Sequence, residues 1–295
     1  MSDSEPYQPA PPEKLAPVPE DSDDTRGPHL RRLLRNPVTL IATSVIAVIA
    51  LVAAGTSAGF GIGAGAAGIV VLLALLVVFL IANNLAHEDF FNAYAKGRSL
   101  TRVSGKSKLP PLTPLLRKGD RRYAAQRFNG VLPGGINGSL VLFTYEDETR
   151  DSDGNKQTTY VHFTLVMSDL PDTAPYLQEL FCQRRVGFRF MDGMEDAFRK
   201  RQRVEQESEA VDKAYEIFIG EQDDMNRARQ VLSPSFLVWL DQNSPDAYAF
   251  ELVAGSLVCN VKGHKKSASE LDKLCQASAA VARRLHEEAN EVVTA

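Results

Sequence analysis

The chain has 295 residues, 44% of them apolar, and a formal net charge of −4. This charge is unevenly divided, because residues 1–25 carry −6, residues 26–95 carry +2, residues 96–122 carry +8 and residues 123–295 carry −8. An acidic domain beside a basic segment excludes nucleic acid as the main partner and indicates that the basic segment faces a membrane surface.

Residues 1–35 are expected to be a disordered, acidic, proline-rich tail with a basic end. Residues 1–28 hold seven prolines and seven acids, and such a composition cannot bury a core. It also differs from a signal peptide, which begins with basic residues and an apolar run. A motif bound by an aromatic-lined groove is the alternative to an inert tail.

Residues 36–86 form a stretch of 51 residues without a charged side chain. Since one span needs about 20 apolar residues, this length fits a two-helix transmembrane hairpin. We expect spans from about Pro37 to Ser57 and from about Gly65 to Leu85, joined by a glycine-rich turn over residues 59–65. The turn should lie near the opposite membrane face, because lipid offers no water to unpaired backbone groups.

Basic residues flank both ends of the hairpin, whereas the loop between the spans is uncharged. The cations expected to bind anionic lipids of the inner leaflet are Arg31, Arg32, Arg35, Lys96, Arg98 and Arg102. The positive-inside rule then places both termini in the cytoplasm and the two spans in the plasma membrane.

Glycines at the turn have the spacing of close helix contact. Gly59 and Gly63, and likewise Gly61 and Gly65, match G-x-x-x-G. Packing between the two helices of one hairpin is one interpretation, and a homo-oligomer formed through these glycines is the other. Residues 63–68 also match a dinucleotide-binding fingerprint, but an apolar span follows and the required acid is absent.

Residues 87–122 are expected to be a basic juxtamembrane linker. Pro110, Pro111 and Pro114 exclude a single helix over this stretch. Its cations would hold it against an anionic leaflet, each contributing about 1 kcal/mol. A site for one specific lipid headgroup is the alternative.

Residues 123–295 predict a soluble α+β domain with a mostly antiparallel sheet. Alternating or β-rich patterns predict strands over Ser139–Tyr145 and Thr158–Met167, with a hairpin turn over Asp151–Asn155. The turn begins like a calcium loop, but its glycine and glutamate spacing does not fit one. A further strand is expected over Asp212–Ile219.

The second half of this domain has stronger local signals. A helix is expected over Asp223–Leu232, and a second should begin at Ser233–Pro234, a capping residue followed by proline. Strands over Ala249–Val253 and Leu257–Val261 should form a hairpin. A long closing helix should start at the capping box formed by Ser267 and Glu270.

One dense basic cluster is the candidate anion-binding site. Its members are Arg184, Arg185, Arg199, Lys200, Arg201 and Arg203. A solvated helix face is the alternative, since glutamates follow directly. Cys182 near two arginines could be an activated thiol, or a buried structural cysteine. The three cysteines and five histidines have no disulfide framework and no metal spacing, so we predict no metal, cofactor or catalytic residue.

Residues 113–262 contain a series of short segments in a characteristic order. These are Leu116–Asp120, Phe143–Tyr145, Phe163–Val166, Leu170–Pro171, Glu207–Glu209, Val231–Phe236, Phe250–Leu252 and Leu257–Val258. Together they resemble a bacterial, notably actinobacterial, family of membrane-anchored proteins that is classed only as a domain of unknown function. The chain departs from it at Val211 and Tyr215, where the family has phenylalanines. The resemblance implies architecture and membrane localisation, and no activity.

These features predict a membrane-tethered cytoplasmic binding or scaffold module with an unidentified protein partner. A well-patterned domain, a basic tether and an acidic tail without a catalytic motif favour this role. The alternative is a membrane-associated enzyme that acts on an anionic or lipid-linked small molecule at the basic cluster. A channel or transporter is least favoured, because the spans contain no charge.

Overall fold

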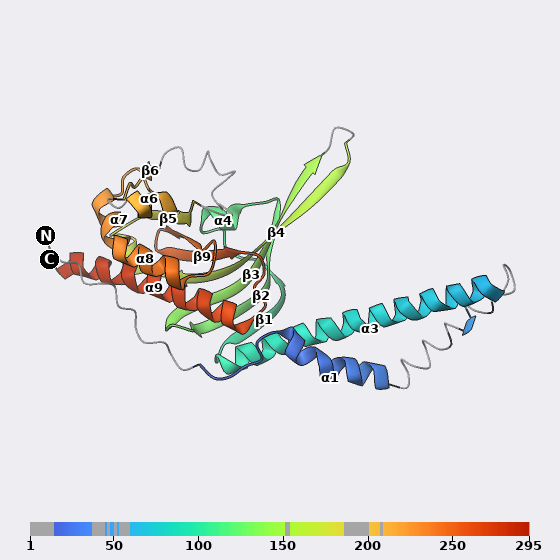
Figure 1. Cartoon of the computed structure of the whole chain (residues 1–295). Helices are drawn as coiled ribbons and strands as arrows, with labels where there is room; N and C mark the ends of the chain where they lie inside the picture. The colour runs from blue at the N-terminus through green and yellow to red at the C-terminus, as the bar shows by residue number, and fades with distance from the viewer. Residues whose placement is uncertain are drawn as a thin grey trace. The chain divides into compact units, whose positions relative to one another are not determined.

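Figure 1 presents the computed structural model of the chain. The structure describes residues 15–36, 45, 48, 49, 52, 60–150, 154–185, 201–206 and 209–294. The chain divides into two compact units, a helical unit over Pro17–Tyr94 and a sheet-containing unit that runs on from Ala95.

Helix α1 (Ser22–Arg35) begins the helical unit. Asp21 caps it by accepting hydrogen bonds from the backbone N–H groups of Asp23 and Asp24. Acids in the first turn and arginines in the last turn complement the helix dipole. Residues 1–35 were expected to be disordered, so this segment is a correction: its capping and charge order are those of a helix.

Helix α3 (Phe60–Gly97) has 38 residues and contains the second expected span. It is long and apolar enough to cross a membrane, with a mean hydropathy of 1.9 over the window that begins at Val71. The first expected span lies outside the described residues apart from positions 45, 48, 49 and 52. Among the described residues, therefore, one helix meets the criteria for a span.

Both ends of α3 differ from the prediction. Residues 60–65, expected in a glycine-rich turn, are helical, since a helix satisfies its own backbone groups even where each glycine costs about 1 kcal/mol. The helix also continues past Leu85 for twelve residues, to Gly97, which adds about 18 Å. Thr25 of α1 donates a hydrogen bond to the Ala86 carbonyl at 2.9 Å.

Within the described residues, the sheet-containing unit has nine strands, in the order β1-β2-β3-β4-β9-β8-β5-β7-β6. All the described strand pairs are antiparallel, so the expected α+β fold with a mostly antiparallel sheet is confirmed. The strands are β1 (Thr101–Ser107), β2 (Arg121–Leu132), β3 (Ile136–Arg150), β4 (Lys156–Asp169), β5 (Glu179–Arg184), β6 (Gln202–Arg203), β7 (Tyr215–Ile219), β8 (Ala249–Val253) and β9 (Ser256–Lys262). The remaining helices are α4 (Pro114–Arg117), η1 (Pro171–Thr173), α6 (Glu209–Ala214), α7 (Met225–Val231), α8 (Pro234–Asn243) and α9 (Ala268–Thr294).

Several local predictions in this unit are confirmed. Strands β3 and β4 pair as a long hairpin, and β8 and β9 pair around Ala254 and Gly255. Both of these turn residues have positive φ, 49° and 81°, as a two-residue turn between right-twisted strands requires. Ser233 accepts the Phe236 N–H at the start of α8, as a capping serine should.

The predicted strand over Asp212–Ile219 is only half correct. Helix α6 takes the residues up to Ala214, and β7 begins at Tyr215. The helical part is supported by a pair between Lys213 and Glu209, one turn apart, at 2.6 Å. The stretch 87–122, expected to be a linker, contains the end of α3 together with β1 and α4, so the sheet begins at Thr101.

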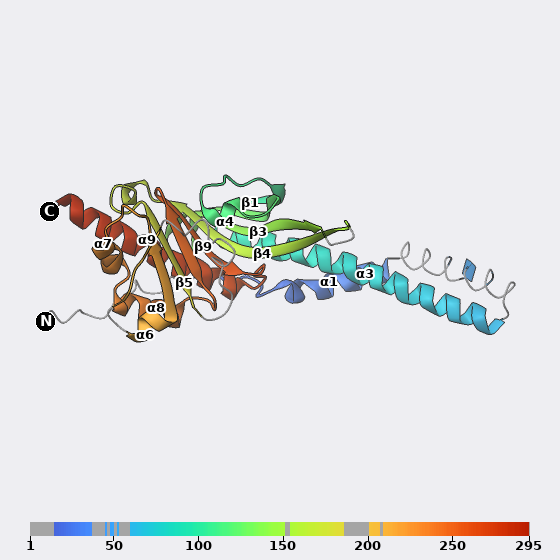
Figure 2. The same cartoon turned by 90° about the horizontal axis from the view of Figure 1, so that it is seen from above.

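The two faces of the sheet are covered by different segments (Figures 1 and 2). Helix α9 packs against β9, and its Ser278 lies close to Cys259 of that strand. The neighbouring Val258 instead belongs to a buried cluster with Leu109 and Leu115, from the segment that contains α4. Because adjacent strand residues point to opposite faces, α9 covers one face of the sheet and the α4 segment covers part of the other.

Candidate functional site

The described arginines of the predicted basic cluster lie on or beside β5 and β6, and each is paired with an acid. The pairs are Arg184–Asp241 at 3.1 Å, Arg185–Asp212 at 3.7 Å, Arg201–Glu179 at 2.7 Å and Arg203–Asp212 at 2.9 Å. Arg199 and Lys200 lie outside the described residues. These four arginines therefore share three carboxylates, so acids of the same chain neutralise most of the positive charge of the cluster.

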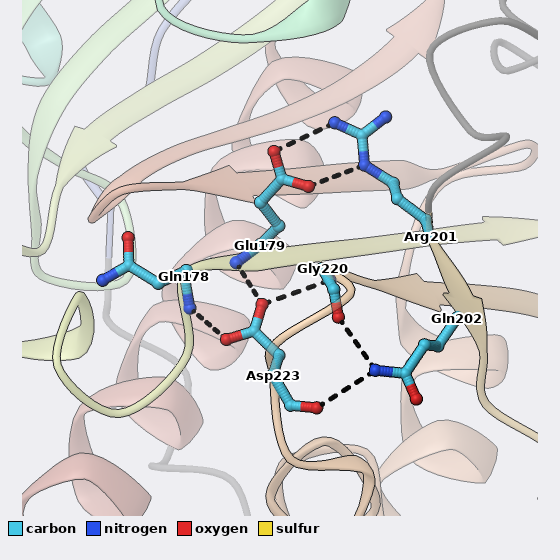
Figure 3. A network of polar contacts seen from close by, with 6 residues as sticks. All are labelled: Gln178, Glu179, Arg201, Gln202, Gly220 and Asp223. Atoms are coloured by element: carbon cyan, nitrogen blue, oxygen red, sulfur yellow. Dashed lines mark hydrogen bonds and ion pairs between the residues drawn. The ribbon is translucent and has the colours of Figure 1, made fainter.

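Figure 3 shows the best-formed of these pairs. Arg201 directs Nε to one oxygen of Glu179 at 2.7 Å and Nη2 to the other at 3.0 Å, which is the two-pronged geometry of a strong guanidinium–carboxylate pair. The guanidinium also lies 4.2 Å from the centre of the Phe181 ring. With both prongs committed and the side chain only 10% exposed, Arg201 is a structural residue here.

Asp223, which Figure 3 also shows, connects two loops through hydrogen bonds. Its carboxylate accepts hydrogen bonds from the backbone N–H groups of Gln178 at 2.8 Å, Glu179 at 2.9 Å and Gly220 at 3.1 Å. Gln202 donates to the Gly220 carbonyl at 3.2 Å. Three charge-assisted hydrogen bonds occupy this carboxylate, so Asp223 holds the loops in place and is a poor candidate for a general base.

A hollow of about 720 Å³ lies beside this network. Its charged lining consists of Glu179, Glu221, Asp223, Asp224 and Arg227. Four carboxylates and one guanidinium make a net acidic surface, the opposite of what an anion requires. The hollow next to Arg201 is therefore a poor fit for an anion, and anion binding by the cluster itself stays a prediction.

The cations that flank the membrane segment divide into two groups. Arg31, Arg32 and Arg35 on α1 and Lys96 on α3 are exposed. Arg98 instead gives Nε and Nη2 to the two carboxylate oxygens of Asp272, at 3.0 and 2.5 Å. The remaining one, Arg102, donates twice to Gln126 Oε1, at 3.0 and 2.8 Å. The guanidinium of Arg98 is thus engaged by a carboxylate of α9, and lipid binding by these cations stays a prediction.

The glycines proposed for oligomerisation lie at the start of α3. Gly61, Gly63 and Gly65 belong to this one helix, whereas Gly59 lies outside the described residues. Gly61 and Gly65 are one turn apart along it, which is the spacing that lets a second helix approach closely. The homo-oligomer stays a prediction.

Two histidines lie side by side near the end of β9. The rings of His162 and His264 have centroids 4.6 Å apart, and Thr144 Oγ1 lies within hydrogen-bonding distance of both rings, at 2.9 and 3.2 Å. Burial lowers the pKa of His264. A metal site needs more ligands, and the described residues contain no group of three or more His, Cys, Asp or Glu placed to hold an ion.

Cys182, Cys259 and Cys275 are all buried. Burial raises the pKa of the Cys182 thiol, and it raises the pKa of Cys259 to about 11. The thiolate is the reactive form of cysteine. The activated-thiol interpretation of Cys182 is therefore wrong, because the nearby arginines pair with acids and a buried thiol stays protonated.

We expect the folded protein to resist alkylation at all three cysteines. A pKa of about 11 instead of 9 leaves about a hundredfold less thiolate at pH 8, and burial also blocks the reagent. The measurement is iodoacetamide labelling of the full chain in detergent, followed by mass spectrometry, with the denatured chain as the control. Labelling of Cys182 in the folded protein at the denatured rate would restore it as a reactive thiol.

Sequence reasoning missed Glu251, which lies on β8 and is completely buried. It accepts a hydrogen bond from Thr113 Oγ1 at 2.5 Å and another from the Leu115 N–H at 3.2 Å. Burial raises the pKa of Glu251 to about 7. The signal that could have found it is a single acid between Phe250 and Leu252 in an otherwise apolar strand.

Sequence reasoning also missed a hollow of about 380 Å³ on the face of the sheet that carries the α4 segment. Arg127 and Asn129 of β2 and Ser139 of β3 line it, together with Asp169 and Pro110. The pairing Asn129↔Ser139 places these side chains on one face. Each residue looks like an ordinary exposed strand position in the sequence, and only the register gathers them.

No protein-family model, curated protein or solved structure matches this chain. The resemblance to the actinobacterial family therefore rests on the short segments alone. What this protein does has to be argued from its own geometry.

Proposed function

We propose that this protein is a membrane-tethered binding or scaffold module whose sheet-containing unit lies in the cytoplasm. The observation that carries the proposal is the continuity of α3. It passes from an apolar stretch into a polar extension that ends at Gly97, and β1 begins at Thr101. Three residues connect the helix to the sheet, so the domain is tethered closely to the membrane segment.

The finer topology belongs to the same proposal. The hairpin would have two spans, the first over about residues 37–57 and the second within α3, with both termini in the cytoplasm. The exposed cations Arg31, Arg32, Arg35 and Lys96 support this orientation through the positive-inside rule and would contact anionic lipids.

The competing role is an enzyme that acts on an anionic or lipid-linked small molecule. Its site would be a pocket that contains several arginines of the basic cluster beside a carboxylate or Cys182. The arginines described there pair with carboxylates, and the thiol of Cys182 is buried. These contacts favour the binding module.

The test is in-cell crosslinking with identification of partners by mass spectrometry. We expect the full chain to capture a reproducible partner that a chain lacking residues 36–86 loses, because the tether concentrates the domain at the membrane. A reporter fused after Ala295, active only in a cytoplasmic format, checks the orientation.

A matched control separates loss of the tether from loss of the fold. The shortened chain should still protect its three cysteines from alkylation if its sheet is intact. A protected but partnerless chain then supports the proposal. The same partners in both chains, or none in the full chain, would contradict it.

A further inference from the structure

Arg127, like Arg102, makes its described hydrogen bonds to neutral groups, but Arg127 also lines a hollow. Its Nε donates to Asn129 Oδ1 at 2.8 Å, and its Nη2 donates to Ser139 Oγ at 3.1 Å. Within the described residues no carboxylate pairs with it, whereas Arg98 and Arg201 each hold one. A partly buried guanidinium without a counter-charge is costly, so its presence needs an explanation.

The groups beside Arg127 accept hydrogen bonds from it, and these bonds leave other donors unused. Ser139 Oγ donates to Asn129 Oδ1 at 2.7 Å, and the same oxygen accepts from Arg127 Nε. With its oxygen used twice, Asn129 keeps its amide NH₂ as a donor. Arg127 likewise keeps Nη1, since its contacts in the described structure use only Nε and Nη2.

These donors line the hollow of about 380 Å³ described above. Its lining also includes Gly138, which brings no side chain, and Pro110 from the segment that covers this face. Asp169 of β4 lies two strands away from Arg127 of β2, a lateral distance of about 10 Å. Within the described residues the two side chains form no ion pair, and Asp169 Oδ1 instead accepts from Ser256 Oγ at 3.4 Å, yet this carboxylate bounds the same hollow.

We propose that this hollow is a binding site for the carboxylate or phosphate group of a small molecule, held by Arg127 and Asn129. A guanidinium that offers a free edge beside an amide donor matches the planar or tetrahedral oxygens of such groups. The ligand's anion supplies the counter-charge that the chain lacks. The site is separate from the tethering role and binds whether or not the domain is anchored.

The experiment titrates the full chain in detergent with inorganic phosphate and, separately, with succinate, by calorimetry. Saturable binding of at least one probe is expected, and the tighter probe identifies the class of anion. Arg127→Gln should weaken that binding about tenfold to a hundredfold, because it removes a charge-assisted hydrogen bond. The matched control is Arg121→Gln on the same strand, whose side chain is 72% exposed, and it should bind like the parent.

A second variant tests the same proposal if Arg127→Gln fails to fold. Asn129→Asp places a carboxylate where Arg127 Nε already donates, so it should abolish binding of either probe and raise the unfolding temperature. The proposal is overturned if the parent binds neither probe, if Arg127→Gln or Asn129→Asp binds as the parent does, or if Arg121→Gln loses as much affinity as Arg127→Gln.

Discussion

Replacing Arg98 by alanine is expected to lower the free energy of unfolding by about 3–5 kcal/mol. The Arg98 side chain is 6% exposed and that of its partner Asp272 is 12% exposed. The two groups meet through both prongs of the guanidinium, at 3.0 and 2.5 Å. Truncation leaves the Asp272 carboxylate buried without its counter-charge, and desolvation of an unpaired charge is the main penalty.

The single tryptophan, Trp239 of α8, provides the signal for denaturant unfolding of the sheet-containing unit in detergent. Arg102→Ala is the matched control, since Arg102 bonds the neutral Gln126, and it should cost about 1 kcal/mol. Combining Arg98→Met with Asp272→Leu should recover most of the loss, because neither charge is then buried alone. If Arg98→Ala unfolds at the parent's denaturant concentration, the pair does not stabilise the fold.

Glu251 is expected to make the fold less stable as pH rises from 5 to 8. Its folded pKa is about 7 and its ordinary value is 4.5, so between these values the folded chain holds a proton that the unfolded chain has released. The free energy of unfolding therefore falls as pH rises through this window, by up to about 1.4 kcal/mol per pH unit. Over the whole window the loss approaches roughly 3 kcal/mol.

Glu251→Gln removes this titration and keeps an oxygen that can accept from Thr113 and Leu115. Relative to the parent, the variant should therefore gain stability between pH 5 and pH 8, measured again through Trp239 fluorescence. Glu270→Gln is the control. Burial raises the pKa of Glu270, but hydrogen bonds from Lys265 and Ser267 outweigh it and lower the pKa. Its contribution is lost only below this window, so its difference from the parent should stay constant from pH 5 to 8. An equal response of both variants would contradict the assignment.

The elements with local causes could be predicted from the amino-acid sequence. The uncharged stretch predicted two apolar helices, of which the second lies within α3 and the first lies mostly outside the described residues, and Ser233 predicted the start of α8. The turn at Ala254 and Gly255 predicted the β8–β9 hairpin. Each of these elements depends on hydrophobic periodicity or on a capping residue a few positions away, so its signal lies in the local sequence. The bounds of α3 and the half-helical segment before β7 were missed, because neighbouring packing and i,i+4 pairing shift where an element ends.

The pairing of charged side chains could not be predicted in the same way, because it depends on contacts between distant parts of the chain. The sequence presents Arg98 and Arg201 as cations in basic runs, yet one meets an acid 174 residues away and the other an acid 22 residues away. Arg127 looks like any strand arginine, but register surrounds it with neutral partners. An ion pair depends on the distance between two groups in space. The order of the strands and the face of the sheet on which each side chain lies set that distance. For this reason the tertiary structure adds the hollow at Arg127 to the predicted cluster as a candidate anion site.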